Sequence, residues 1–595
     1  MPERQVPIGS YGLIGDTRTA ALVAPDGAID WCCAPRFDSP PVFGRLVGGE
    51  AAGAFTIAPV DPVESTSRAY RGHTASLVTT WRLADSEVEL TDAMVANVTG
   101  TALPGTVLVR QVRARARAAR VVVRLAPRFG YDRRPAARTR RRLGALLLDR
   151  GSVAIAVTTS GPQLEPEEHV VIDVGEGEVM TIVVTVTRHG PAVIVPPAAA
   201  LAALERDERF WTHWAQSLDA PFRRDVVTRS LLTLRLLTYS PSGAPVAAPT
   251  TSLPEWPGGA RNWDYRFAWP RDASIGIGAF LGAGRTDEAR RFLWWLLHAG
   301  RLARPRLPVL FTLDGRRGTD ERTLPGWPGY AGSLPVRVGN GAAGQHQLDG
   351  YGWVLDAAWL LTSAGHRLYP ETWRTMAGFA DHVAQRWRDP DAGIWEKRDE
   401  PAHHVHSKLM AWTALDRAVR IAAARGDRKE RRTRRWAAER DLLAAQIRER
   451  GCDPAVGVYT AAYGTTELDA AVLLLPVLEF EPAGSAHVRD TVDVIRQRLS
   501  PGGPLVHRYP PGTDGLAGPE GAFLPCSFWL VQGLAMTGRR AEAVEVFDEL
   551  IGLGGPLGLF GEEAHPATRE QLGNFPQALT HAALVQAAAA IARAG

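Results

Sequence analysis

Residues 347–425 read QLDGYGWVLDAAWLLTSAGHRLYPETWRTMAGFADHVAQRWRDPDAGIWEKRDEPAHHVHSKLMAWTALDRAVRIAAAR and show how most of the chain is organised. Apolar residues recur at helical spacing in three segments, which predicts helices over about 347–364, 370–388 and 406–425. A short link near Pro370 joins the first two, whereas a long loop joins the last two. This stretch therefore predicts antiparallel helices whose connections alternate in length.

The same alternation continues across residues 223–595. Because short and long connections leave opposite ends of the helices, every long loop should gather on one rim. Six such hairpins closed in a ring would form an (α/α)6 barrel, whereas an open solenoid would show a sequence repeat of fixed period, and none is evident. The remaining predicted helices span about 223–240, 271–283, 285–299, 428–450, 466–479, 486–499, 522–537, 539–552 and 574–594.

The N-terminal third has a different pattern. Residues 1–197 contain short β-branched runs, such as 120–125 and 181–186, separated by Gly, Pro and Asp turn signals. This pattern predicts an antiparallel β-sandwich, with residues 198–222 forming a helical linker to the barrel. The predicted fold is therefore a multidomain α and β chain, a β-sandwich followed by an (α/α)6 barrel.

Charge argues against a nucleic-acid partner. The 595 residues carry a formal net charge of only +4, and dedicated nucleic-acid binders concentrate a basic excess. The single anomaly is an arginine-rich stretch from Arg110 to Arg150, in which Arg113, Arg115 and Arg117 alternate with alanine. That alternation is typical of the solvated face of a strand.

Cysteine content and hydropathy favour a cytoplasmic protein. Four cysteines are too few for a disulfide framework and lack the spacing of a zinc site. No apolar run is long enough to span a membrane, and the N-terminus lacks the apolar segment of a secretory signal. We therefore expect no membrane partner, while homo-oligomer formation is left open.

The long loops are rich in tryptophan, arginine and carboxylates, which is typical of a sugar pocket. Aromatic rings cover the C–H face of a pyranose, and paired charged groups bind its hydroxyls. The five most informative loops lie at 263–272, 339–349, 393–398, 507–509 and 561–577.

Two carboxyl groups in separate loops are candidates for glycosidic bond cleavage, which needs one protonated and one ionised carboxyl. Glu396 directly follows Trp395, and apolar cover would raise its pKa towards the protonated form. Glu562 comes from another loop and can approach the bond from the other side. Because His403, His404 and His406 lack a matching ligand set at a standard spacing, we expect no metal and no cofactor.

Motifs along almost the whole chain resemble glycoside hydrolase family 15, the family of glucoamylases, glucodextranases and bacterial trehalases. In the helical half they are Arg261–Tyr265 with Trp269, Arg271 and Asp272, then 406–417, then 572–578. In the N-terminal part, 11–16, 26–31 and 35–40 resemble the trehalase-like β-sandwich domain. Whether the loop at 35–40 reaches the barrel mouth is left open.

The resemblance implies an inverting, exo-acting α-glucoside hydrolase that releases β-glucose from the non-reducing end, with trehalose or a short α-glucoside as substrate. It implies that Glu396 is the general acid and Glu562, rather than its neighbour Glu563, the general base. Such carboxyls should stand about 6.5–9.5 Å apart. The resemblance further implies the following set: Tyr265 near the nucleophilic water, and Arg271, Asp272, Trp269, Trp395, Gln347 and Arg508 around the sugar.

The chain departs from the family pattern at positions that we expect to alter the pocket lining, namely Phe267, Ala268, Pro270, Gly350, Trp353 and Gly561. Two alternatives stay open from sequence. One is an inverting disaccharide phosphorylase of similar architecture, which would need phosphate in place of water and no base carboxylate. The other is a catalytically silent sugar-binding protein.

Overall fold

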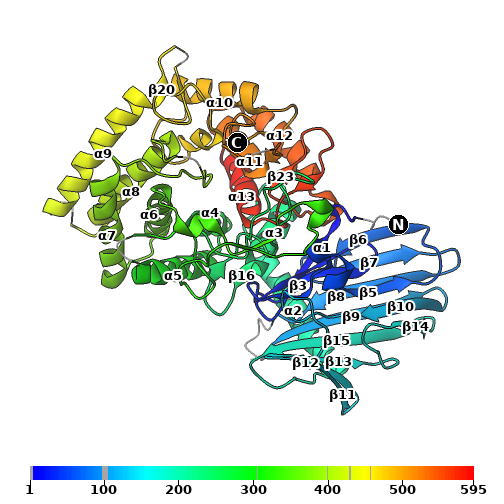
Figure 1. Ribbon diagram of the computed structural model, residues 1–595. Helices are drawn as coiled ribbons and strands as arrows, with labels where there is room; N and C mark the ends of the chain where they lie inside the picture. The colour runs from blue at the N-terminus through cyan, green and yellow to red at the C-terminus, as the bar shows by residue number, and fades with distance from the viewer. Residues whose placement is uncertain are drawn as a thin grey trace.

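The computed structural model describes residues 5–96, 105–303, 306–398, 400–427, 430–455, 457–516 and 518–594. Within this part of the chain, a unit of two β-sheets lies beside a ring of helices (Figure 1). Buried apolar side chains from both units belong to one continuous core.

The N-terminal unit is an antiparallel β-sandwich, as predicted. A seven-stranded sheet has the order β1-β2-β3-β5-β10-β14, with β4 paired to β3, and an eight-stranded sheet has the order β11-β12-β13-β15-β9-β8-β7-β6. The strands are β1 (Gly12–Gly15), β2 (Ala20–Val23), β3 (Ala28–Cys33), β4 (Pro41–Phe43), β5 (Phe55–Pro59), β6 (Ser65–Tyr70), β7 (Leu77–Arg82), β8 (Glu87–Met94), β9 (Thr106–Arg115), β10 (Ala119–Leu125), β11 (Arg138–Arg142), β12 (Ala145–Arg150), β13 (Val153–Thr159), β14 (His169–Val174) and β15 (Val179–Arg188).

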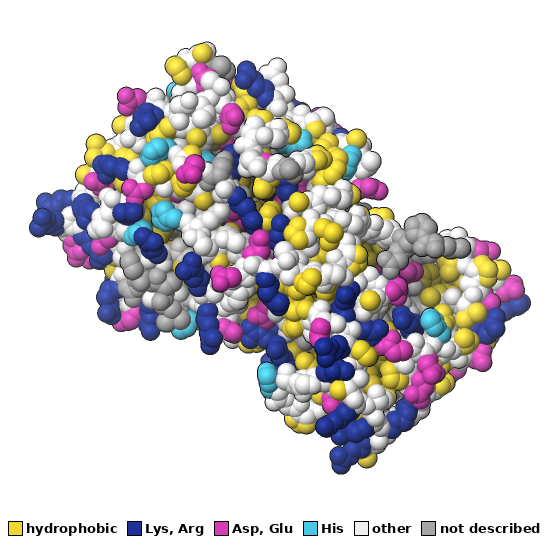
Figure 2. Space-filling view, viewed as in Figure 1, with side chains coloured by type: hydrophobic (Ala, Val, Ile, Leu, Met, Phe, Trp, Pro, Cys, Tyr) yellow, Lys and Arg dark blue, Asp and Glu magenta, His cyan; other side chains and the backbone are white. Residues whose placement is uncertain are grey.

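The arginine-rich stretch is mostly solvated, as its alternation predicts. Arg113 and Arg115 of β9 are exposed while Ala114 between them is buried, and the arginines of β11 form a basic tip on the sandwich (Figure 2). Arg110 is the exception, since it is fully buried. It pairs with Asp92 at 2.6 Å and donates to the carbonyl of Phe55, so it joins the two sheets through the core.

Helix α2 (Pro197–Gln216) connects the two units. Its Ala200 and Leu204 pack on Val107, Val109 and Val183 of the eight-stranded sheet. The predicted linker is therefore also a layer on the outer face of the sandwich.

The helical unit is a closed double ring, which confirms the predicted (α/α)6 barrel. The inner elements contact one another in order, and the last packs against the first: α4 (Pro270–Gly282), α6 (Asp349–Ser363), α8 (Val405–Ala424), η5 (Ala470–Leu474), α11 (Leu524–Met536) and α13 (Ala578–Arg593). Alternating with them along the chain are the outer helices α3 (Arg224–Leu236), α5 (Thr286–Ala303), α7 (Pro370–Arg386), α9 (Arg431–Arg450), α10 (Ala486–Leu499) and α12 (Arg540–Gly552).

One predicted helix is wrong in type. The segment expected to be helical at 466–479 is the 3₁₀ helix η5 followed by turns. Pro476 has no backbone N–H to continue an α-helical ladder, which accounts for the interruption. Even so, η5 occupies an inner position of the ring between α8 and α11.

The remaining elements are short and lie in the connections or in the N-terminal unit. A three-stranded sheet, β22 (Ala522–Phe523), β23 (Glu563–Ala564) and β24 (Gln571–Leu572), joins the loops before α11 and α13. The others are α1 (Arg45–Gly48), β16 (Thr238–Tyr239), β17 (Ala244–Pro245), β18 (Arg322–Thr323), β19 (Arg337–Val338), β20 (Cys452–Asp453), β21 (Val458–Tyr459), η1 (Ile8–Ser10), η2 (Glu50–Ala52), η3 (Tyr330–Gly332), η4 (Gly341–Gly344) and η6 (Gly555–Leu557).

Among the helices of the described residues, none combines the length and apolar character needed to cross a lipid bilayer.

Candidate active site

A pocket lies where the long loops meet. About 700 Å³ of its space is free of protein atoms, and this volume includes open solvent. All five loops that the sequence analysis singled out contribute to its wall. The lining residues are Glu255, Trp263, Tyr265, Arg271, Asn340, Ala342, Ile394, Trp395, Glu396, Lys397, Arg398, Arg508, Tyr509, Asp514, Leu516, Phe523, Glu562 and Gln577.

Glu396 sits on a strained turn between α7 and α8. Its φ is +58°, a left-handed conformation that a residue with a Cβ adopts at a cost of about 1 kcal/mol or more. Gln345 holds this turn, because its Nε2 donates to the carbonyls of Glu396 and Lys397, each at 3.0 Å. Arg271 also donates to the carbonyl of Ile394 at 3.0 Å. The surrounding loops therefore fix the turn that presents Glu396.

The carboxyl group of Glu396 has two nitrogen neighbours. Trp269 Nε1 donates to its Oε1 at 2.7 Å, and Arg271 Nη1 lies 3.5 Å away. Burial raises the pKa of Glu396, while Arg271 and Trp269 act in the opposite direction. Arg271 is itself held by Asp272 at 2.7 Å.

Glu562 is buried more deeply, with 1% of its surface exposed. The Tyr265 hydroxyl donates to its Oε1 at 2.6 Å. Burial raises the pKa of Glu562, and the charge of Glu255 raises it further, whereas Arg508 and the Tyr265 hydrogen bond lower it. Burial raises the pKa of the Tyr265 hydroxyl, and the neighbouring Glu562 raises it further, so this phenol stays protonated and remains a donor.

The two carboxyl groups belong to one constellation. Tyr265 and Trp269, which bind Glu562 and Glu396 respectively, come from the same loop, and their ring centroids lie 5.6 Å apart. Both carboxyls line the same pocket. The neighbouring Glu563 is absent from that lining, is fully buried and accepts from the Gly521 N–H at 2.9 Å.

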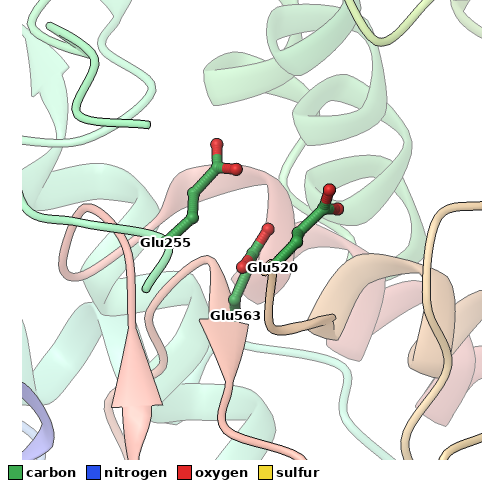
Figure 3. A group of neighbouring side chains, drawn as sticks. All are labelled: Glu255, Glu520 and Glu563. Atoms are coloured by element: carbon green, nitrogen blue, oxygen red, sulfur yellow. The ribbon is translucent and has the colours of Figure 1, made fainter. Parts of the chain in front are cut away.

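Next to Glu562 in the chain, Glu563 forms a cluster of three buried carboxyl groups with Glu255 and Glu520, which come from separate segments (Figure 3). Their oxygens lie within 4.8 Å of one another, a spacing that could hold a metal ion. Arg508 already fills this cluster. It contacts Glu520 at 2.6 Å, Glu255 at 2.9 Å and Glu563 at 3.2 Å.

Arg261 supplies a second cation to these carboxyls, pairing with Glu520 and, at 2.9 Å, with Asp514. Two guanidinium groups at the carboxylate oxygens would repel a divalent cation. We therefore interpret the cluster as an arginine–carboxylate network rather than a metal centre. It holds Arg508 with its guanidinium 5.7 Å from the Trp395 ring, both of them in the pocket wall.

Three residues expected to touch substrate lie behind the pocket lining. Asp272 pairs with Arg271, and Trp269 is buried with its indole N–H on Glu396. Gln347 contacts Gln345 at 3.2 Å rather than the pocket. In this structure Asp272 and Trp269 contact the pocket-lining groups Arg271 and Glu396, whereas Gln347 contacts Gln345, which holds the turn that carries Glu396.

The expectation that the family departures alter the pocket lining is wrong. None of Phe267, Ala268, Pro270, Gly350, Trp353 and Gly561 is among the lining residues. Phe267 instead packs with Trp269 and Val309 in a small apolar cluster.

Sequence reasoning missed Glu255 and Asp514, which line the pocket, and Asp469, which accepts from the Trp395 indole at 2.9 Å. A signal for Glu255 was present. It adjoins Trp256 in a loop rich in Gly and Pro, the same kind of Trp–Glu pair that drew attention to Glu396. Asp514 and Asp469 carry no such local signal.

Comparisons with known proteins agree with this architecture. Residues 221–589 match the glycosyl hydrolases family 15, and residues 1–191 match the trehalase-like N-terminal domain. The trehalase of Mycolicibacterium smegmatis is 34% identical over 622 residues, covering 99% of this chain and 92% of that protein. The trehalase of Thermoplasma volcanium is 31% identical over 583 residues, covering 97% and 92%.

A solved bacterial glucoamylase complexed with acarbose superposes with a TM-score of 0.72 at 14% identity, covering 100% of this chain and 96% of that one. This similarity supports the fold of a β-sandwich followed by an (α/α)6 barrel. Together with the family matches, it shows that the chain belongs to glycosyl hydrolase family 15 and is a glycoside hydrolase with a trehalase-like N-terminal domain.

Proposed function

We propose that this glycoside hydrolase is an inverting, exo-acting α-glucosidase whose preferred substrate is trehalose, with short α-glucosides as weaker substrates. The trehalases that align along nearly the whole chain support trehalose. Glu396 acts as the general acid and Glu562 as the general base. The observation that carries the proposal is that these two carboxyls, from different loops, line one pocket with separate hydrogen-bond donors.

The acid step begins with protonated Glu396. Burial favours this state, and the group gives its proton to the glycosidic oxygen as the bond to the anomeric carbon breaks. Once Glu396 is ionised, Arg271 at 3.5 Å and the Trp269 N–H stabilise the carboxylate. The site thus favours the acid before transfer and its conjugate base afterwards.

The base step uses ionised Glu562. Its carboxylate removes a proton from water as that water attacks the anomeric carbon from the opposite face, which inverts the configuration. Burial and the charge of Glu255 raise the pKa of Glu562 to about 8, and the Tyr265 hydrogen bond to Oε1 opposes this shift by favouring the ionised form. We expect the two carboxyls to lie about 6.5–9.5 Å apart, the spacing that leaves room for the water.

The position of the pocket at one end of a closed ring supports exo-action. The inner helices close the ring behind the loops, an arrangement in which a sugar would enter end first. Arg271, Trp395 and Arg508 would contact the terminal glucose and its neighbour, since all three line the wall. Asp272, Trp269 and Gln347 support that wall from behind.

The decisive experiment is hydrolysis of trehalose followed by proton NMR before the anomers equilibrate. Inversion gives one β-glucose and one α-glucose from each α,α-linked molecule, whereas retention gives two α-glucose molecules. Maltose, isomaltose and maltotriose in parallel define the linkage preference. Two α-glucose products would contradict inversion. Glucose 1-phosphate formed only with added phosphate would favour a phosphorylase, and no turnover of any substrate would refute the proposal.

A further inference from the structure

Successive residues of the loop between α3 and α4 face different parts of the molecule. Trp263 and Tyr265 line the pocket. Asp264 and Arg266 are buried, with exposed side-chain fractions of 0% and 2%. Side chains of an extended backbone alternate in direction, so this segment can present one face to substrate and the other to the β-sandwich.

The Arg266 side chain enters the β-sandwich. Its Nη1 donates to the Ser39 carbonyl at 3.1 Å and to Cys33 Sγ at 3.4 Å, and its Nη2 donates to the Tyr131 hydroxyl at 3.1 Å. Cys33 ends β3, Ser39 lies before β4, and Tyr131 follows β10. The loop at 35–40 therefore contacts the catalytic loop from behind instead of lining the pocket.

Asp264 completes the coordination of Arg266. The carboxylate accepts from Arg266 Nε at 2.9 Å and from Nη2 at 2.7 Å, a bidentate pair. Together with the three contacts to the β-sandwich, this gives every one of the five guanidinium donors a partner. Such a side chain has one defined position.

Asp264 also holds the next pocket loop. Its Oδ2 accepts from the Gly339 N–H at 3.1 Å, and Asn340 Nδ2 donates to the Asp264 carbonyl at 3.3 Å. Asn340 lines the pocket. The Asp264–Arg266 pair therefore joins two pocket loops to the β-sandwich.

The same loop holds both proposed catalytic carboxyls. Tyr265, between the two residues of the pair, donates to Glu562 at 2.6 Å, and Trp269, three residues after Arg266, donates to Glu396 at 2.7 Å. A displacement of Arg266 would move both donors together.

We propose that the β-sandwich positions the catalytic loop, with Arg266 and Tyr131 as positioning residues that set where Tyr265 and Trp269 meet the two carboxyls. Neither Arg266 nor Tyr131 lines the pocket, so their effect passes through the loop. The catalytic consequence rests on the proposed function, whereas the docking of the loop does not.

The test compares two identical substitutions in the β-sandwich, Tyr131→Phe and Tyr70→Phe. Tyr131→Phe removes the hydroxyl bound by Arg266 but keeps the ring, which packs on Trp327. Tyr70 is the matched control, because its hydroxyl binds the backbone of Leu13 within the sandwich. We expect Tyr131→Phe to lower kcat for trehalose about fivefold, the effect of one hydrogen bond, with KM unchanged.

Hydrogen–deuterium exchange supplies a readout independent of catalysis. Amides of residues 263–272 should exchange faster in Tyr131→Phe than in the unmodified chain, and at the unmodified rate in Tyr70→Phe. Arg266→Lys keeps the charge but loses the five-donor geometry, so it should show the same pattern more strongly.

Equal losses of kcat in both Tyr→Phe variants would overturn the proposal, because they would reflect general destabilisation of the sandwich. Unchanged exchange and unchanged kcat in Tyr131→Phe would overturn it as well. If the unmodified chain hydrolyses no α-glucoside, the proposed function fails, while the exchange comparison still decides whether the sandwich positions the loop.

Discussion

The surroundings of Glu396 and Glu562 differ although both glutamates line one pocket. Glu396 lies on a strained loop turn, its side chain is 19% exposed, and Arg271 is its nearest cation. Glu562 directly precedes strand β23, is 1% exposed and adjoins Glu563 of the carboxyl cluster of Glu255, Glu520 and Glu563.

The two glutamates therefore differ in which neighbours set the pKa of the carboxyl group. At Glu396, burial raises the pKa most, Arg271 and the Trp269 hydrogen bond lower it, and the charges of Asp272 and Asp349 raise it further. At Glu562, the balance depends on several buried charges, in which Glu255 raises the pKa and Arg508 lowers it. Substitutions around Glu562 should therefore change pH dependence, whereas substitutions around the Glu396 turn should change geometry.

The largest effect is expected from Glu396→Gln and Glu562→Gln. Each should lower kcat on trehalose by several orders of magnitude, because general acid and base catalysis each contribute roughly 10²–10⁴-fold. With α-glucosyl fluoride, whose leaving group needs no proton, Glu396→Gln should recover most of its rate and Glu562→Gln should not. Initial rates on both substrates check this.

Glu481→Gln provides the control, since Glu481 pairs with Arg448 away from the pocket. Thermal unfolding of all three variants establishes that they are folded. Equal recovery of both active-site variants on the fluoride would contradict the assignment of distinct acid and base roles.

Tyr265→Phe should have the next largest effect, about 10–100-fold in kcat/KM, as expected for loss of a hydrogen bond to a charged group. The bond lowers the pKa of Glu562, so its removal raises that pKa. The base is active when ionised, and activity on the acid side rises as pH rises through this pKa. The acid limb of the kcat/KM profile should therefore move to higher pH; a shift to lower pH would be inconsistent with Glu562 as the base.

Gln345→Ala tests the turn that carries Glu396. It removes two hydrogen bonds to the carbonyls of Glu396 and Lys397, and we expect kcat to fall about tenfold, the effect of roughly 1.4 kcal/mol. Because no charge changes, the pH profile should keep its midpoints. A moved midpoint without a loss of rate would show that Gln345 acts on charge and not on geometry.

Glu255→Gln should have the smallest effect at the pH optimum, about twofold. The charge of Glu255 raises the pKa of Glu562, so its neutralisation lowers that pKa. The acid limb should then move to lower pH, opposite to the shift in Tyr265→Phe. A kcat/KM profile measured across the acid range checks this, and an unmoved limb would show that Glu255 has no influence on the base.

Most of the fold was predictable because it follows from local patterns. Alternating β-branched runs and helical spacing identified the sandwich and the alternating connections of the barrel. The predicted α-helix over 466–479 was wrong because the apolar spacing was followed across Pro476, which breaks the helical hydrogen-bond ladder. The alternation of arginine and alanine predicts exposed arginines, but Arg110 is buried. Its ion pair with Asp92 lies in the core of the sandwich, a tertiary feature that strand alternation does not reveal.

The candidate site was predictable as a set of loops but less so as a set of contacts. Glu396, Glu562, Tyr265, Arg271, Trp395 and Arg508 all line the pocket. Sequence could not show that Trp269 reaches Glu396 by its indole N–H, or that Arg508 gathers three carboxyls, because these contacts join segments far apart in the chain. Their individual catalytic roles stay predictions.

Among the described residues, the network around Arg508 contains more acids than bases, since the ion pairs of Glu255, Glu520, Glu563 and Asp514 are with Arg261 and Arg508. Losing one acidic charge relieves this excess, while losing a guanidinium enlarges it inside a poorly solvated region. Substitutions in this network should therefore differ between its acids and its arginines. We expect homologues to carry Gln in place of Glu at the acidic positions far more often than they carry another residue in place of Arg508. A homologue without Arg508 should also have lost acidic residues from the network.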